Sequence, residues 1–361
     1  MTIQKRQLLD ALKLAMPGIE TGTATLQGSD AFVFHNGNIF SYNDSISVSV
    51  PLSQAGLVEE NLEGAVKAEE FFKVIGKFPG DEISFVANEG NWILKSGKAK
   101  AEMTLMDFDF ETRLKGIEPS EEWVTITEDF ITGLAICKMT NNKSPLSGIY
   151  INGKEIFSTD GWQINRYTMN ECELPIFWIS DKTVDELLKI GKFTSMQVQG
   201  TWVHFKTEEG TLFSAKTLFV DKYPFEKAKS LLNTSNPKDT DFHAKFPKEL
   251  FNAIDRATSF SIDISEHSAV RLVLSKEKIV VSAERSSGKY EEKIAWEDEV
   301  GDFEEMTVYV DATMMQYAGT RTLEFYIQEG VVRNNGKKIP RLLFVTSQSI
   351  HLMSTLDNGD E

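Results

Sequence analysis

The feature of this sequence that most restricts its fold is a long internal repeat. Three amphipathic segments, QKRQLLDALKLAM, TEDFITGLAICKM and FPKELFNAIDRAT, begin at residues 4, 127 and 246, about 120 residues apart. A second set of helical segments, each followed by strand-like stretches, begins at residues 66, 179 and 310. A period this long indicates a repeated domain rather than a solenoid unit, because each third can bury its own core.

The repeat predicts an α+β chain of three similar domains, each with two helices and antiparallel strands. We place the domains at residues 1–119, 120–240 and 241–361, with the second boundary at the polar, turn-rich segment 232–240. The last residues, LDNGDE, carry no apolar pattern and predict an acidic C-terminal tail. We therefore expect the function to depend on shape more than on one catalytic cleft.

Composition narrows the class of protein further. The hydrophobic content of 41% and the 24 Phe residues are ample for packed cores. No run approaches the ~18 apolar residues of a membrane span and no signal peptide opens the chain, so we expect a soluble, cytoplasmic protein. Cys137 and Cys172 have no metal or redox spacing and are predicted to be free thiols. The net charge of −16 argues against a simple nucleic-acid binder.

Local patterns predict individual elements within the thirds. Asn36-Gly37 is a strong hairpin turn. Apolar residues at helical spacing, closed by Pro17-Gly18, predict a helix at the start of the chain. Further helices are expected at 67–77 and 181–190, and strands at 31–35, 46–51, 83–87, 91–95, 99–105, 123–127, 148–151, 155–158 and 174–179.

Despite the acidic total, Lys or Arg recurs on the solvent side of helices in all three thirds. On a helical wheel Lys182 and Lys189, for example, lie opposite the apolar stripe that includes Leu187. An ordinary solvated surface and a repeated cationic face both explain this pattern. The helix expected at 311–318 carries neither Lys nor Arg. The cationic set comprises Arg6, Lys13, Lys73, Lys77, Lys182, Lys189, Lys248 and Arg256.

The sequence contains no complete motif that indicates a catalytic site. Residues 148–154 match the start of a phosphate-binding loop, but Glu155 follows where a Ser or Thr hydroxyl is needed for magnesium. The five histidines have no ligand spacing, and no nucleophile motif is present. We expect a protein that is not an enzyme and holds no metal or cofactor.

The segment Ser158-Thr159-Asp160-Gly161-Trp162-Gln163-Ile164 resembles the bacterial sliding clamp, the beta subunit of DNA polymerase III, which carries T-D-G-H-R-L-A at this point. Other segments resemble the same family in order and spacing. They are Ala65-Val66-Lys67 through Phe71-Phe72 to Lys77-Phe78-Pro79-Gly80, then Lys95-Ser96-Gly97-Lys98, and Asp221-Lys222-Tyr223-Pro224. The match spans nearly the whole length, including the repeat.

The resemblance implies a clamp fold whose chains form a head-to-tail homodimer, a ring of six domains around duplex DNA. Helices would line the channel, so the helix cations listed above would contact phosphates without reading sequence. The acidic excess on the exterior would disfavour sideways adsorption to DNA. The protein would act as a non-catalytic processivity factor in DNA replication.

Ring closure requires an interface between the first domain of one chain and the third domain of the other. In the family, edge strands pair there, which satisfies backbone groups that would otherwise invite association. The resemblance assigns Ala101, Met103 and Phe260 to this interface. Ala101 is smaller than the apolar residues that the family usually has, and a capped edge in a monomer is the alternative.

The resemblance also implies a pocket that receives a short linear peptide from the DNA polymerase and the clamp loader. Trp162 and Gln163 replace the family's His-Arg pair, and Ser354 stands where Pro is usual, so the preferred peptide would differ. Such divergence would fit a clamp of a phage or mobile element with its own polymerase. Trp162 as a core residue, and an adaptor of the same fold that does not encircle DNA, are the alternatives. The implied pocket residues are Leu146, Thr159, Gly161, Trp162, Ile164, Pro224 and Met353.

Overall fold

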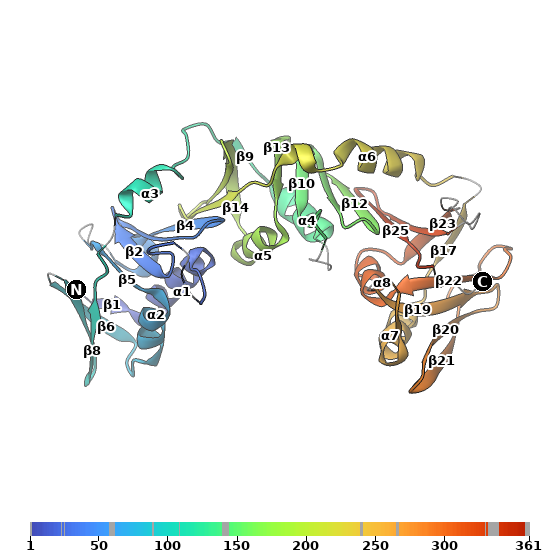
Figure 1. The fold of residues 1–361 in the computed structure, drawn as a ribbon, viewed down its shortest axis with the longest axis horizontal. Coiled ribbons are helices and arrows are strands. Elements are labelled where there is room, and N and C mark those ends of the chain that lie inside the picture. Colours follow the sequence, from blue (N-terminus) through green and yellow to red (C-terminus); the bar gives the residue numbers. More distant parts are fainter. Residues whose placement is uncertain are drawn as a thin grey trace. The chain divides into compact units, whose positions relative to one another are not determined.

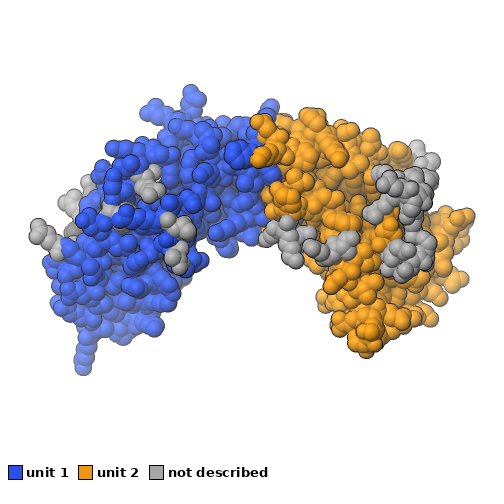
Figure 2. All heavy atoms as spheres, viewed as in Figure 1, with its two compact units in different colours: residues 1–131, 171–220 blue, residues 132–170, 221–361 orange. Residues whose placement is uncertain are grey.

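The computed structural model of the chain describes residues 2–22, 24, 26–57, 62–88, 90–107, 109–138, 144–238, 241–264, 267–328, 330 and 339–357. These residues form two compact units (Figure 2). Unit 1 comprises residues 1–131 and 171–220, and unit 2 comprises residues 132–170 and 221–361. Both units therefore contain part of the middle third, and the division into three domains stays a prediction. The end of the predicted acidic tail, residues 358–361, lies outside the described residues.

The first third contains the predicted helices and strands, together with three further strands, at 2–4, 38–42 and 64–67, and a short helix at 111–115. The Asn36-Gly37 turn, where both residues have positive φ (46° and 73°), leads into an additional strand, β3, because this geometry folds the chain straight back. The elements of this third are β1 (Thr2–Gln4), α1 (Lys5–Ala15), η1 (Met16–Gly18), β2 (Ala31–His35), β3 (Asn38–Tyr42), β4 (Ile46–Pro51), η2 (Leu52–Ala55), β5 (Gly64–Lys67), α2 (Ala68–Lys77), β6 (Glu82–Asn88), β7 (Asn91–Ser96), β8 (Ala99–Thr104) and α3 (Glu111–Lys115).

The middle third repeats this order. Ser180 caps its second helix by accepting a hydrogen bond from the backbone N–H of Thr183 at 3.2 Å. A helix, α6, runs into the segment 232–240 that we expected to be a turn-rich boundary, so that expectation was wrong for its first residues. The elements are β9 (Val124–Thr125), α4 (Glu128–Cys137), β10 (Ile149–Gly153), β11 (Glu155–Thr159), β12 (Gln163–Thr168), β13 (Leu174–Ile179), α5 (Asp181–Ile190), β14 (Phe193–Gln199), β15 (Trp202–Thr207), β16 (Leu212–Lys216), η3 (Val220–Lys222) and α6 (Phe225–Thr234).

The last third follows the same order with one short extra strand, β18. Its second helix is capped by Asp311, whose side chain accepts a hydrogen bond from the N–H of Met314 at 2.8 Å. The elements are β17 (Phe242–Lys245), α7 (Lys248–Ala257), η4 (Thr258–Phe260), β18 (Ile262–Ile264), β19 (His267–Leu274), β20 (Lys278–Arg285), β21 (Gly288–Ala295), β22 (Met306–Asp311), α8 (Ala312–Gly319), β23 (Glu324–Gln328), β24 (Arg341–Val345) and β25 (Ser349–Ser354).

Apart from β18 and the helices α3 and α6, each third therefore consists of two copies of a strand–helix–three-strand run (Figure 1). The first strand of one copy pairs with the first of the three strands of the other, as in the sheet order β1-β6-β7-β8. Within unit 1, β5-β2-β3-β4 and β9-β14-β15-β16 share one continuous sheet, because the last strands β4 and β16 pair with each other. Within unit 2, β12 and β25 pair in the same way. We call these two strand pairs the seams.

In each unit, helices pack against the sheet. In unit 1, α1 and α2 pack on each other and on the sheet (Figure 1). Their core centres on Trp92, whose ring lies edge-on to Phe34 and Phe85 at centroid distances of 4.9 and 5.2 Å. In unit 2, α7 packs on α8, and Phe246 stacks on Phe325. Each unit thus buries a core of its own that holds its seam in place.

Candidate functional site

A pocket of about 260 Å³ opens in unit 2 beside the β12·β25 seam. It brings together residues from five separate stretches of the chain, including six of the seven that the resemblance assigned to a peptide pocket. The lining residues are Leu146, Thr159, Gly161, Trp162, Ile164, Pro224, Lys227, Ala228, Leu231, Arg341, Leu352 and Ser354.

The floor of this pocket is the seam itself. Ile164 on β12 lies opposite Leu352 on β25, and both line the cavity. Met353, the remaining assigned residue, is fully buried in the core of unit 2 and is not among the lining residues. Because successive side chains of a strand point to opposite faces, Met353 supports the floor from beneath while its two neighbours line the pocket.

One wall of the pocket is the tight turn between β11 and β12. The Asp160 carboxylate accepts hydrogen bonds from the backbone N–H groups of Trp162 and Gln163 at 2.9 and 3.0 Å. Gly161 has φ +96°, and a Cβ added there would meet no atom within 4 Å. The backbone conformation, and not crowding, therefore calls for glycine at this position.

Trp162 has both of the environments that the sequence left open. Its ring packs against the core of unit 2 and lies edge-on to His267, with centroids 4.8 Å apart. It is only partly buried, and it also lines the pocket. The neighbouring Gln163 faces inward, where its amide nitrogen donates to Asp160 at 2.9 Å and its amide oxygen lies 3.0 Å from Nε2 of His351. Gln163 therefore braces the turn from below and does not line the pocket.

The burial of His351 fixes its role in this brace. Burial, together with the positive charge of Arg321, holds the pKa of His351 well below its usual range, so the imidazole is neutral. A neutral imidazole that donates from Nε2 matches the acceptor oxygen of Gln163. The turn that carries Trp162 is thereby tied to β25 through buried polar contacts.

Sequence reasoning missed the helical wall and one end of the pocket. Lys227, Ala228 and Leu231 come from α6, and Arg341 comes from the start of β24. The spacing of Phe225, Ala228 and Leu232 in α6 is that of an amphipathic helix and could have indicated this wall. No local signal marks Arg341, because its place depends on a strand pairing.

A second cavity, of about 380 Å³, lies beside the other seam, in unit 1. There, Ser47 on β4 lies opposite Ser214 on β16, and both line the cavity. The hydroxyl of Ser214 is 2.8 Å from Nδ1 of the buried His204. The two seams thus have the same strand topology, but the seam in unit 1 is polar and the seam in unit 2 is apolar. Ser47 and Ser214 stand where unit 2 has Ile164 and Leu352.

The cations that the sequence placed on helix faces lie on α1, α2, α5 and α7, and all of them are exposed. Many are paired with an acid on their own helix. Lys13 lies 3.0 Å from Asp10, and Lys189 lies 2.8 Å from Glu186. Arg6 is paired with Asp10 and Lys73 with Glu69, whereas Lys77, Lys182 and Lys248 form no ion pair among the described residues. Exposed pairs of this kind are weak and exchange easily with other anions.

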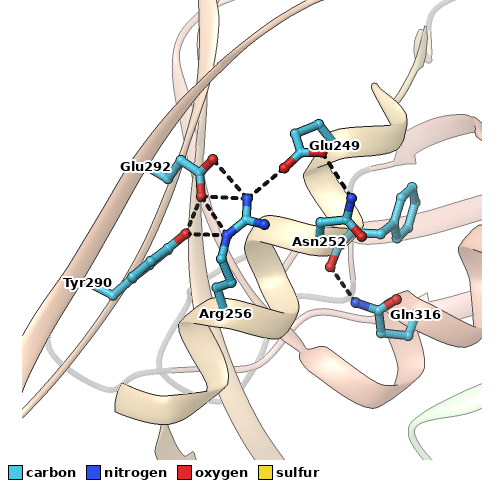
Figure 3. A network of polar contacts seen from close by, with 7 residues as sticks. Glu249, Asn252, Arg256, Tyr290, Glu292 and Gln316 are labelled. Atoms are coloured by element: carbon cyan, nitrogen blue, oxygen red, sulfur yellow. Dashed lines mark hydrogen bonds and ion pairs between the residues drawn. The ribbon is translucent and has the colours of Figure 1, made fainter.

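Arg256 differs from the other cations because a network holds it against the sheet (Figure 3). Its guanidinium donates to Glu249 on the same helix at 2.6 Å and to Glu292 on β21 at 2.9 Å. It also donates to the hydroxyl of Tyr290, which in turn donates to Glu292. These hydrogen bonds raise the pKa of Arg256 and lower that of Glu249. The network joins α7 to the edge strand β21 and neutralises the cation.

The residues assigned to a chain–chain interface lie on or beside sheet edges. Ala101 and Met103 belong to β8, which pairs only with β7 within the described chain, and the inward-facing Met103 is mostly buried. Phe260 lies beside the start of β21, since a Cβ added to Gly288 would come within 2.7 Å of its ring. β21 itself pairs only with β20 among the described strands.

The described residues hold no cluster of three His, Cys, Asp or Glu side chains that could bind a metal ion. None of the helices in the described part of the chain has the length and apolar character that a membrane crossing needs. No protein-family model and no curated protein sequence matches the chain.

Solved structures, in contrast, match it from end to end. The DNA polymerase sliding clamp of Bacillus subtilis is 20% identical, with a TM-score of 0.76 over 99% of this chain and 98% of that one. The beta subunit of the Streptococcus pyogenes DNA polymerase is 17% identical, with a TM-score of 0.77 over 99% of both chains. The Helicobacter pylori beta clamp bound to a DNA ligase peptide is 16% identical, with a TM-score of 0.74 over 99% and 100%. The chain therefore has the fold of the bacterial sliding clamps over its whole length.

Proposed function

We propose that this protein is a DNA sliding clamp, a non-catalytic processivity factor that closes into a ring around duplex DNA and tethers a polymerase. The observation that carries the proposal is the clamp fold over the whole chain. It is accompanied by two edge strands, β8 and β21, which have only one neighbour each among the described strands. Pairing β21 with β8 of another copy would continue the repeated strand pairing. The three domains would be residues 1–119, 120–240 and 241–361. The clamp loader and the polymerase would bind through short peptides, as a DNA ligase peptide binds the Helicobacter pylori clamp.

The order of the seams supports head-to-tail closure. In each seam the last strand of one half-repeat pairs with the last strand of a half-repeat in the next third, as β4 does with β16 and β12 with β25. The next step of this series joins β21 to the strand equivalent to β16 and β25, which is β8 of another copy. Both edges then gain the backbone hydrogen bonds that exposed edge strands lack.

The repeat also supplies a register for this pairing. Ser47, Ile164 and Lys289 occupy equivalent positions, because each stands five residues after its hairpin partner (42 to 47, 159 to 164, 284 to 289). In the β12·β25 seam, Ile164 faces Leu352, which stands nine residues after its own partner (343 to 352). On β8 the residue nine after its partner is Glu102 (93 to 102).

Lys289 of one copy would therefore face Glu102 of the other, and Glu291 would face Lys100. Between these charge pairs, Tyr290 would face Ala101. All four charged residues are exposed in the single chain, and opposite charges facing each other across strands stabilise a sheet. From the sequence, the small Ala101 was expected to weaken the interface. In this register its small side chain leaves room for the bulky ring of Tyr290.

Unpaired cations support the DNA-binding part of the proposal. Lys77, Lys182 and Lys248 are exposed and free of ion pairs among the described residues, so they can contact phosphates without breaking an existing contact. Arg6, Lys13, Lys73 and Lys189 would first exchange their acidic partners. Arg256, held by two carboxylates, would contribute least and would serve mainly to position β21.

Retention on circular DNA tests the proposal. The protein, loaded onto nicked circular duplex, should remain bound at high salt and be lost when the circle is linearised. Equal retention on both forms would contradict encirclement and favour an adaptor that uses the same fold without enclosing DNA. Joint reversal of Lys77, Lys182 and Lys248 to Glu should reduce retention while leaving the mass of the dimer unchanged, with Lys238→Glu as a control at an exposed site outside the set.

A further inference from the structure

The pocket in unit 2 has an unbalanced set of charges. Two of its lining residues, Lys227 and Arg341, are cations, and no Asp or Glu is among the described residues that line it. This is unusual in a chain with a net charge of −16. Neither cation forms an ion pair within the described residues, so both charges are available to a ligand.

Strand pairing sets Arg341 at one end of the pocket. Arg341 on β24 lies opposite Ser354 on β25, and the N–H of Ser354 donates to the carbonyl oxygen of Trp162 at 2.9 Å. These three residues therefore form one row across the sheet. The apolar floor of Ile164 and Leu352 lies beside this row, two residues along the strands. A ligand with an apolar group on the floor would reach Arg341 within one or two residues of its own chain.

The environment of Arg341 favours an anionic partner. The residue is half-buried, and burial lowers its pKa because the charged form loses hydration. An arginine keeps its charge even so, and a partly buried guanidinium without a counter-ion is an unfavourable arrangement. A carboxylate offers the planar, two-oxygen acceptor that matches the guanidinium fork.

The cavity in unit 1 provides an internal comparison. It stands at the equivalent seam, yet its floor carries Ser47 and Ser214, and its lining includes Glu111 and Glu118 alongside Lys115. The cationic, apolar character is therefore specific to the pocket in unit 2 and is not a general consequence of this fold.

We infer that the pocket in unit 2 selects a short peptide that places an apolar side chain on the Ile164–Leu352 floor and an adjacent Asp or Glu side chain against Arg341, with Lys227 as a second contact. This inference rests on the proposed function, because it specifies which peptide the clamp receives. Arg341 is then the specificity-determining residue of the pocket. Lys227, which is exposed on α6, contributes through a weaker and more salt-sensitive contact.

Fluorescence anisotropy with the full chain tests this assignment. The probes are three peptides with both ends blocked, each carrying a Leu-Phe pair and differing only in a flanking Asp, Asn or Lys. Blocked ends exclude a contribution from a terminal carboxylate. The Asp peptide should bind about tenfold more tightly than the Asn peptide, since a charge-assisted hydrogen bond contributes more than a neutral one. The Lys peptide should bind more weakly than both.

Two variants separate the charge from the pocket. Arg341→Gln should remove the preference for Asp over Asn while leaving Asn-peptide binding within about twofold, and Arg341→Lys should retain part of the preference. Lys238→Gln, which removes a cation outside the pocket, should change neither. Equal binding of the Asp and Asn peptides would overturn the role of Arg341 and leave the clamp proposal intact. Binding of no peptide, or binding that survives Ile164→Glu, would instead overturn the peptide pocket itself.

Discussion

The register proposed for the β8·β21 contact makes a charge-swap experiment decisive. Glu102 of one copy should face Lys289 of the other, so Glu102→Lys would place two lysines opposite each other. Glu102 already accepts a hydrogen bond from Asn91, and Lys289 lies 3.9 Å from both Glu284 and Glu291, so both side chains stand on the exposed faces of their strands. The reciprocal change, Lys289→Glu, would place two carboxylates there.

The size of the effect follows from the cross-strand geometry. An opposed charge pair contributes roughly 0.2–1 kcal/mol, and like charges cost a similar amount, so the reversal changes each interface by about 1 kcal/mol. A ring of two copies contains the interface twice, which gives about 2 kcal/mol, or roughly a 30-fold weaker dimer. Combining Glu102→Lys with Lys289→Glu restores opposite charges and should return the dissociation constant to within about threefold of the original.

Sedimentation equilibrium over a range of protein concentrations measures this dissociation constant for each variant. Glu208→Lys makes the same charge change at an exposed turn residue and serves as the matched control. The proposed register is wrong if both single variants dimerise as well as the original. It is also wrong if the double variant loses as much dimer affinity as the two single variants together. A chain that remains monomeric without any substitution would refute closure itself.

Three further predictions concern single sites. Burial lowers the pKa of His204 from 6.5 to about 4, so the unfolded chain binds a proton that the folded chain excludes. The free energy of unfolding should therefore fall as the pH drops from 6.5 towards 4, by up to about 3 kcal/mol. Urea unfolding of the original protein and of His204→Gln at pH 7.5 and 5 checks this, and an equal loss in both would contradict it. Burial raises the pKa of the Cys137 thiol to about 12, and Cys172 is also buried. Neither thiol should therefore react with a thiol reagent before the protein unfolds, and rapid labelling of the native protein would disprove this prediction. Gly161→Ala forces a side chain into φ +96° and should cost about 1–2 kcal/mol by thermal or urea unfolding, an effect that an unchanged midpoint would exclude.

Much of the fold was predictable from local sequence patterns. Apolar residues at helical spacing located α1, α2 and α5, and the Asn36-Gly37 pair located a hairpin turn, because these elements depend on neighbours within a few residues. The expectation failed at α6, whose short amphipathic pattern follows a Tyr-Pro turn and merges into a polar segment. The strand β3 was missed because its five residues lie between two stronger turn signals.

The candidate pocket was predictable to a smaller extent. The turn from Thr159 to Ile164 contributes much of the lining from one continuous stretch, so resemblance over a short motif sufficed to find it. Met353 shows the limit of such carry-over, since a strand position decides whether a side chain faces the pocket or the core. Arg341 reaches the pocket only because β24 pairs with β25, and no local pattern reports that pairing.

The repeat, the alternation of helices and strands and the recurrence of cations on helix faces were all predictable from the order of the residues alone. How those features combine depends on contacts between distant parts of the chain. In the fold, β4 pairs with β16 and β12 with β25, β8 and β21 are edges among the described strands, and Glu292, 36 residues away in sequence, neutralises Arg256. The physical reason is that periodicity records which face of an element is buried, whereas strand pairing and ion pairing depend on residues far apart in the chain.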